Sequence, residues 1–184
     1  MGFNGINEDT YSRLIIDSGE VYQGFNGFSS LGTSLGCTRG GNQFTIEQEV
    51  REMEADGSRG PVEGSRRITR IKASLTCNFL EHTLAGFKRA LVASSSATFE
   101  TNWDAITRSA EIASTDYISN VTIVGDVSGL NGAMAIRLNN ALSDGNFELA
   151  FTDKDEGVLA VTFTAHFDPA NLTIEPWTIY WPNV

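Results

Sequence analysis

The amino-acid sequence predicts an all-β protein with one flanking α-helix, folded as a β-sandwich or partial barrel from which a long hairpin protrudes. Three observations support this prediction. Many short segments alternate apolar and polar residues, as strands with one buried face require. Clusters of Gly, Asp, Asn and Pro separate these segments and indicate turns. One segment alone has the three- and four-residue apolar spacing that is typical of an amphipathic helix.

Length and composition favour one globular domain that covers residues 1–184, with 41% hydrophobic residues. The formal net charge of −10 argues against bulk attraction of the molecule to nucleic acid or to anionic membranes. The N-terminal residues lack a signal-peptide pattern, and no apolar run reaches the roughly 20 residues of a membrane span. We therefore expect cytosolic synthesis and two reduced cysteines, Cys37 and Cys77.

The N-terminal part of the chain predicts little regular structure. Residues 1–11 are rich in Gly and Asn and lack periodicity, so we expect an N-terminal arm. Short strands are expected at 13–17 and 21–25, on either side of a turn at Ser18-Gly19. A loop of small residues follows at 26–36.

Residues 40–80 predict one long β-hairpin. Its first arm, 43–55, and its second arm, 65–79, both alternate, and a tip with the sequence DGSRGPVEG joins them. A typical strand has about 5–6 residues, and these arms are roughly twice as long, so the hairpin must leave its own globule unless another element covers it. Acidic residues crowd the first arm and basic residues the second. The pattern leaves open whether these charges pair within the hairpin or with another copy of the chain.

The rest of the chain predicts one helix and then strands. Leu84, Phe87 and Leu91 form an apolar stripe, which predicts the helix at 81–93. Residues 98–113 are less regular, with Trp103 and Ile106 as expected anchors. Further strands are expected at 118–124, 133–139, 146–152, 158–167 and 173–181.

The chemistry-bearing residues do not form a recognisable catalytic pattern. The two histidines, His82 and His166, lack metal-ligand spacing, and no nucleophile elbow is present. The turn TDKDEG at 152–157 faintly resembles a calcium loop but lacks the remaining ligand positions. We therefore expect a protein without enzymatic activity, without a metal site and without a cofactor.

Four stretches carry a resemblance to a known family. They are LGCTRGGNQFTIEQEVREMEADGSRGPVEGSRRITRIKASLTCNFLE (35–81), YISNVTIVGD (117–126), SDGNFELAFTDKDEGVLAVTFTAHFDPANL (143–172) and EPWTIYWP (175–182). In their order and spacing, these stretches resemble the major tail tube proteins of long-tailed bacteriophages with non-contractile tails. The resemblance implies a β-sandwich with one flanking helix that assembles as stacked hexameric rings. It also implies that inner strands of the subunits join into one barrel, and that a long hairpin reaches the next ring.

The resemblance further implies a location and partners. The protein would reside in the tail of the virion after assembly in the host cytoplasm, and the genome would pass through the tube without specific binding or a membrane partner. The other partners would be the tape measure protein, the tail terminator and the tail tip or baseplate proteins. The candidate residues for lining the lumen are Glu47, Glu49, Arg70 and Lys72. The candidates for contacts between rings are Glu52, Glu54, Asp56, Arg59, Glu63, Arg66 and Arg67.

Two alternatives remain open at this stage. The chain could be the inner tube protein of a contractile tail or injection apparatus, which shares the fold of the family. It could also be a carbohydrate-binding β-sandwich module that stacks sugars on Trp103, Trp177, Tyr180 and Trp181.

Overall fold

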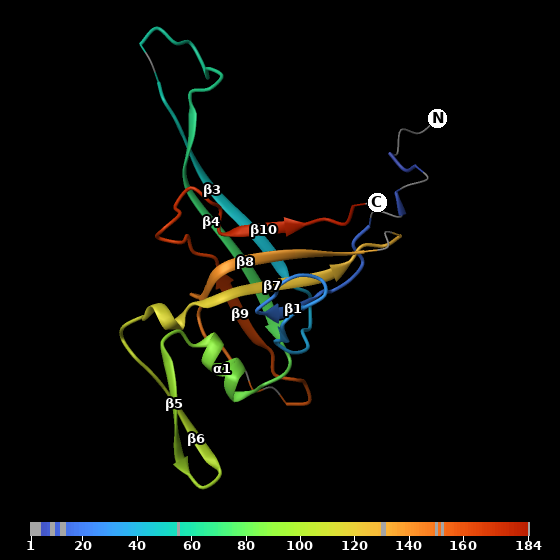
Figure 1. Cartoon of the computed structure of the whole chain (residues 1–184), viewed down its shortest axis with the longest axis vertical. Coiled ribbons are helices and arrows are strands. Elements are labelled where there is room, and N and C mark those ends of the chain that lie inside the picture. The colour runs from blue at the N-terminus through green and yellow to red at the C-terminus, as the bar shows by residue number, and fades with distance from the viewer. Residues whose placement is uncertain are drawn as a thin grey trace.

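The computed structural model describes residues 5–7, 10–11, 14–54, 56–129, 132–149, 151 and 153–183. It confirms an all-β fold with one flanking α-helix (Figure 1). The strands are β1 (Glu20–Gln23), β2 (Thr33–Ser34), β3 (Gln43–Glu52), β4 (Arg66–Phe79), β5 (Ser94–Glu100), β6 (Trp103–Arg108), β7 (Ile118–Asp126), β8 (Ala133–Ser143), β9 (Leu159–Thr164) and β10 (Trp177–Tyr180). Part of the predicted N-terminal arm, residues 1–4 and 8–9, lies outside the described residues.

Eight of the strands form one antiparallel sheet that folds over its own core. Its order is β2-β1-β7-β8-β9-β4-β3, and β10 pairs with β8. β8 connects two layers: its residues up to Ala141 pair with β7, and its last two residues, Leu142 and Ser143, pair with β9. The two layers bury one shared core, with Val21, Val121 and Leu138 from one layer and Leu75 and Phe163 from the other among its members. This arrangement is a sandwich that β8 closes along one side.

The long hairpin consists of β3 and β4, in the register Phe44↔Leu75 to Glu52↔Arg66 with an irregularity between Glu49 and Val50. The predicted alternation on β4 is confirmed from Ala73 onward, where every second residue up to Phe79 is buried. Before Ala73, no residue of β4 is buried. The hairpin therefore belongs to the body at one end and projects from it at the other, as Figure 1 shows.

The helix α1 (Leu84–Ala90) is shorter than the predicted 81–93. It begins after Thr83, whose side chain accepts a hydrogen bond from the backbone N–H of Gly86 and so caps the first turn. Glu81 instead accepts a hydrogen bond from the backbone of Cys37. At the other end the chain leaves the helix at Leu91, and Ala93 takes a positive φ of 55°.

Among the described residues, two strands predicted from the sequence, at 13–17 and 146–152, do not form, and one region is more regular than expected. Residues 14–19 are irregular, although Asp17 accepts a hydrogen bond from the backbone of Asp126 beside the end of β7. In the predicted strand at 146–152, the described residues form a single bridge, Leu149↔Leu159, and the ring of Phe147 packs on Phe87 of the helix. Residues 94–108, by contrast, form the separate hairpin β5–β6.

Candidate functional site

The most conspicuous feature of the surface is the projecting end of the β3–β4 hairpin. We call residues 50–68 the distal hairpin. Its apolar side chains lie open to solvent: Val50 is 47% exposed and its cross-strand partner Ile68 is 56% exposed, and Met53 and Val62 are also exposed. Soluble monomers seldom cluster exposed apolar side chains on a projecting arm, so the distal hairpin is a candidate contact surface.

The cross-strand charges of the hairpin pair with one another only in part. Arg70 lies opposite Glu49, with 3.5 Å between Nη1 and Oε1, and Arg66 approaches Glu52 at 3.3 Å between Nε and Oε2. The Arg70–Glu49 side chains are about two-thirds exposed, and such exposed pairs contribute about 0–1 kcal/mol. At these two positions the charges pair within the hairpin, which is one of the two arrangements that the sequence leaves open, and the pairs add little to the stability of the fold.

Lys72 departs from this pattern. The register places Glu47 opposite Lys72, yet the Lys72 ammonium lies 3.4 Å from Oδ2 of Asp144, in the turn after β8. The hydroxyl of Thr164 donates a 2.6 Å hydrogen bond to the other oxygen of this carboxylate. The sequence did not reveal Asp144, because nothing in a turn with the sequence SDG indicates which strand it approaches.

Together these side chains form what we call the polar face, the side of β3, β4 and β9 that points away from the core. The hydroxyls of Thr76 and Thr162 lie 3.1 Å apart on this face. The members of the polar face are Thr45, Glu47, Glu49, Arg70, Lys72, Ser74, Thr76, Thr162, Thr164 and Asp144. The four predicted lumen residues therefore share one face, on which three carboxylates accompany two basic groups. The face is polar with a small acidic excess rather than uniformly acidic.

The predicted contacts between rings lie on the distal hairpin. Glu54, Asp56, Arg59 and Glu63 occupy its irregular tip, where a few turn hydrogen bonds, such as Met53 N to Ser65 O at 3.0 Å, hold the loop. Arg67 lies directly opposite Arg51 in the ladder. In the described part of the chain, none of Arg51, Arg59 and Arg67 has a carboxylate within 4.0 Å, so three guanidinium groups are available to a partner.

A second projecting arm is the β5–β6 hairpin, at the opposite end of the long axis of the molecule (Figure 1). Sequence analysis missed it. Phe99 is 72% exposed and Trp103 is 69% exposed, so Trp103 does not anchor this segment to the body as predicted. The hairpin joins the body near the helix, where the Ser94 hydroxyl donates to the carbonyl of Lys88. It is therefore a second candidate contact surface.

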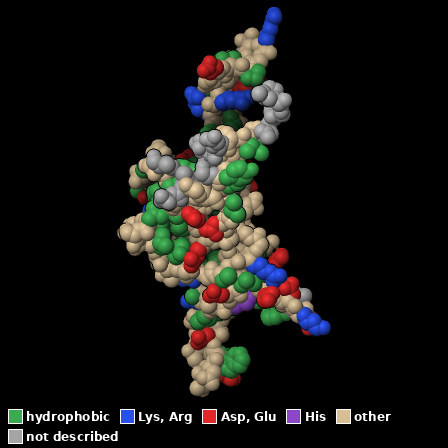
Figure 2. All heavy atoms as spheres, turned by 90° about the vertical axis from the view of Figure 1, so that its right-hand side faces the viewer, with side chains coloured by type: hydrophobic (Ala, Val, Ile, Leu, Met, Phe, Trp, Pro, Cys, Tyr) green, Lys and Arg blue, Asp and Glu red, His purple; other side chains and the backbone are tan. Residues whose placement is uncertain are grey.

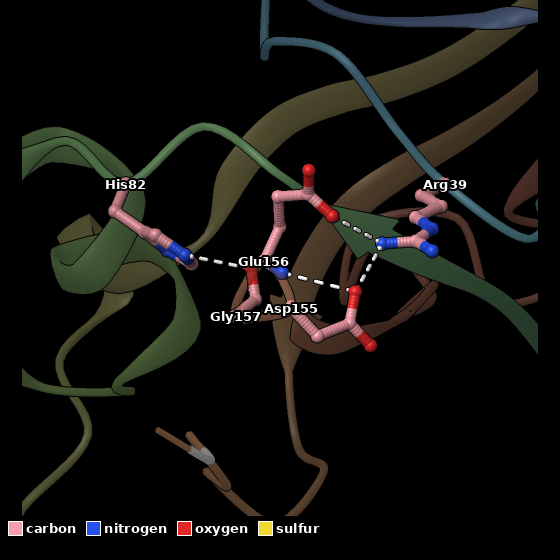
Figure 3. A network of polar contacts seen from close by, with 5 residues as sticks. All are labelled: Arg39, His82, Asp155, Glu156 and Gly157. Carbon is pink, nitrogen blue, oxygen red and sulfur yellow. Dashed lines mark hydrogen bonds and ion pairs between the residues drawn. The ribbon is translucent and has the colours of Figure 1, made fainter. Parts of the chain in front are cut away.

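An arginine holds the loop before β9 through two ion pairs. Figure 3 shows Arg39 between two carboxylates, with Nη1 2.9 Å from Oδ1 of Asp155 and 2.6 Å from Oε2 of Glu156. The guanidinium lowers the pKa of Asp155 below its usual value. These two acids thus already have a cationic partner, and the described residues contain no group of three or more His, Cys, Asp or Glu side chains arranged to hold a metal.

Both histidines contact backbone carbonyls. Nε2 of His82 lies 2.9 Å from the carbonyl oxygen of Gly157 (Figure 3), and its ring stacks on Phe87. Nδ1 of His166 lies 3.2 Å from the carbonyl oxygen of Asn140. A cleft of about 500 Å³ beside the helix contains the exposed Cys37 but is lined by neither histidine. Each ring therefore has a hydrogen-bonding partner within the body, and His166 also lines a separate cleft of about 290 Å³.

Three of the four aromatic residues considered for sugar stacking lie in separate surroundings, and the fourth, Trp181, is 50% exposed. Trp177 packs against the core, with its ring centroid 6.2 Å from that of Phe44. Tyr180 packs on Phe25, with a centroid distance of 5.9 Å. Trp103 belongs to the separate β5–β6 hairpin. Trp103, Trp177 and Tyr180 therefore do not form one common stacking platform.

Comparison with known proteins adds no relative: no family model matches the sequence, and no curated protein matches it. Across the described part of the chain, no helix has both the length and the apolar character needed to cross a membrane.

Proposed function

We propose that this chain is a structural protein that polymerises with copies of itself. In particular, we propose that it is a major tail tube protein of a long-tailed phage with a non-contractile tail. Its subunits form hexameric rings, and the rings stack into a hollow tube through which the genome is delivered.

The observation that carries the proposal is the distal hairpin. A two-stranded ribbon gains little from folding by itself in water, and ordering each residue costs about 1–2 kcal/mol of backbone entropy. In a single subunit, no described segment covers Val50 or Ile68, which are 47% and 56% exposed. Contact with a neighbouring subunit would bury these apolar groups and offset the cost of ordering the arm.

The edge of the sheet supports the same proposal. β3 has ten residues and pairs with β4 alone, so its other edge is free among the described strands. A long free edge promotes pairing with other chains, and a closed ring of subunits removes every such edge. The edge of β3 is therefore suited to pairing between the subunits of one ring.

The polar face suits the wall of a channel. Half of its side chains carry hydroxyls, and both of its basic groups approach carboxylates, Arg70 at 3.5 Å and Lys72 at 3.4 Å. Phosphates bind proteins tightly when lysine and arginine are free to replace counterions. A face whose bases are already paired would let DNA pass without strong contacts.

Sedimentation velocity over a series of concentrations, followed by negative-stain images, tests the proposal. We expect a shift from slow subunits to large particles, with rings and tubes in the images. A monomer at every concentration, even after tail tip proteins are added as nuclei, would contradict the proposed function.

A further inference from the structure

We infer that the distal hairpin of one copy docks on the β5–β6 hairpin of a neighbouring copy, where Arg51 and Arg67 meet the carboxylates of Glu100 and Asp104. The inference rests on the proposed function and deepens it, because it names the surface that receives the projecting arm. The two arms lie at opposite ends of the subunit (Figure 1). A contact between them is therefore head-to-tail, and such contacts propagate from copy to copy.

The first observation is the pair of like charges on the distal hairpin. Arg51 and Arg67 are direct cross-strand partners, and like charges in this position destabilise a ladder. Nη1 of Arg67 donates to two backbone carbonyls, those of Gly64 at 3.0 Å and Arg66 at 2.9 Å. Within the described residues no carboxylate neutralises the pair, and a carboxylate from another molecule would remove the repulsion.

The second observation is the opposite chemistry of the other arm. Glu100 and Asp104 occupy neighbouring positions at the turn of β5–β6, opposite Trp103 and Thr98 respectively. From Ser95 to Thr107 this arm contains no lysine or arginine, and in the described structure neither acid has a basic group within 4.0 Å. Figure 2 shows red and green side chains, but no blue, at the end of this lower arm on the face in view.

The third observation is that β5–β6 is incomplete as a structural unit. It is a two-stranded sheet outside the main sheet, and such isolated hairpins are marginally stable in water. Its exposed Phe99 and Trp103 supply apolar area for a partner, and an indole ring also attracts a guanidinium group. The distal hairpin can make both the apolar and the guanidinium–indole contacts, because it carries Arg51 and Arg67 beside the apolar Val50 and Ile68.

Charge also limits where on the distal hairpin the contact lies. Glu54, Asp56 and Glu63 occupy the loop beyond the arginine pair, and they would repel Glu100 and Asp104 of the neighbour. The contact therefore lies at the end of the ladder, at Arg51 and Arg67, and not at the outermost turn. The chain itself carries both complementary surfaces, which makes a second copy the partner.

The test is a charge exchange between two variants. Arg67→Glu and Glu100→Arg each place like charges across the proposed contact, so each variant alone should need a roughly tenfold higher concentration to form tubes, about 1.4 kcal/mol of lost contact. In an equal mixture, subunits of the two variants can alternate along the assembly. The substituted position 67 of one variant then faces the substituted position 100 of the other, and the native Arg67 faces the native Glu100, so every contact again joins opposite charges. We expect the mixture, and the double variant Arg67→Glu/Glu100→Arg, to assemble within about threefold of the wild-type concentration.

Lys154→Glu is the matched control, because it reverses a charge on a side chain that is 88% exposed on another loop. This variant should assemble like the wild type. Circular dichroism melting shows whether each variant is folded, and all three positions are exposed. Single variants that assemble like the wild type, or a mixture that assembles no better than either one, would overturn the inference and leave the proposed function standing. A wild-type protein that forms no tubes would instead overturn the proposed function, and the inference with it.

Discussion

Shortening the long hairpin separates its role in assembly from its role in folding. Glu49 and Arg70 are Cα partners in the ladder, so a two-residue Asn-Gly turn can join them in place of residues 50–69. The body of the protein retains every residue of its main core cluster, including Ala73, Leu75 and Phe163. We expect the shortened protein to fold and to lose the ability to form tubes.

The magnitude of the stability change follows from what the removed segment contacts. The described residues of this segment form one cross-strand ion pair, Glu52–Arg66, and pairs like this contribute about 0–1 kcal/mol at a surface. Its apolar side chains Val50 and Ile68 are about half exposed in the subunit, and the entropy cost of ordering the segment disappears with it. The free energy of unfolding should therefore change by less than about 1 kcal/mol, or about 2–4 °C in melting temperature.

Urea unfolding and negative-stain imaging measure the two effects, with Leu75→Ala as the comparison. Leu75 is fully buried, and its truncation should cost about 2–5 kcal/mol. If the shortened protein loses as much stability as Leu75→Ala, the distal hairpin supports the fold and is not a free arm. If it forms tubes at the wild-type concentration, the distal hairpin does not connect rings.

Four further predictions follow from individual groups. Trypsin should cleave first after Arg59, in the irregular tip, and assembly should protect this bond; equal cleavage before and after assembly would mean that the tip stays free. The double variant Glu47→Lys/Glu49→Lys should fold, because substitutions at exposed positions shift stability by about 0.5 kcal/mol or less. Its tubes should nevertheless bind DNA more tightly than wild-type tubes in a fluorescence anisotropy assay at low salt. An affinity for DNA equal to that of the wild type would place these side chains outside the channel. Burial raises the pKa of the Cys77 thiol to about 12, so at about pH 8 a maleimide should modify only the other, exposed cysteine of the folded protein, and rapid loss of both thiols would contradict this. A backbone hydrogen bond from Asp126 lowers the pKa of Asp17 below its usual 3.8, so the charged carboxylate adds stability above about pH 4, and this stability is lost as the pH falls through the lowered pKa. In urea unfolding, Asp17→Asn should therefore have a lower free energy of unfolding than the wild type at about pH 6, and the difference should shrink toward about pH 3. A difference that does not change with pH would exclude this cause.

The sequence predicts those elements whose side chains alternate against the core. On β4, the residues Ala73, Leu75, Cys77 and Phe79 are all buried, so their period-two pattern identifies both the strand and its inner face. The β5–β6 hairpin has no such pattern, because Phe99 and Trp103 point into solvent. Alternation of apolar and polar residues indicates which face of a strand is buried within its own chain. It therefore cannot predict a hairpin that has no buried face.

The ends of elements and the ion pairs depend on contacts between distant segments. The stripe that includes Leu91 predicts a longer helix, but the positive φ of Ala93 turns the chain into β5. Lys72 pairs with Asp144 at 3.4 Å because the fold brings the turn after β8 to β4, and local sequence does not encode that proximity. The polar face and the distal hairpin were therefore predictable from the hairpin pattern, whereas the β5–β6 hairpin and the partner of Lys72 were not.

The arrangement of the subunits is tested most directly by an electron cryomicroscopy reconstruction of the assembled particles. We expect hollow tubes with six-fold symmetry, with the polar face of β3, β4 and β9 toward the lumen and the distal hairpin crossing to the next ring. Solid filaments, or rings in which Glu47 and Glu49 face the outside, would contradict the proposed channel.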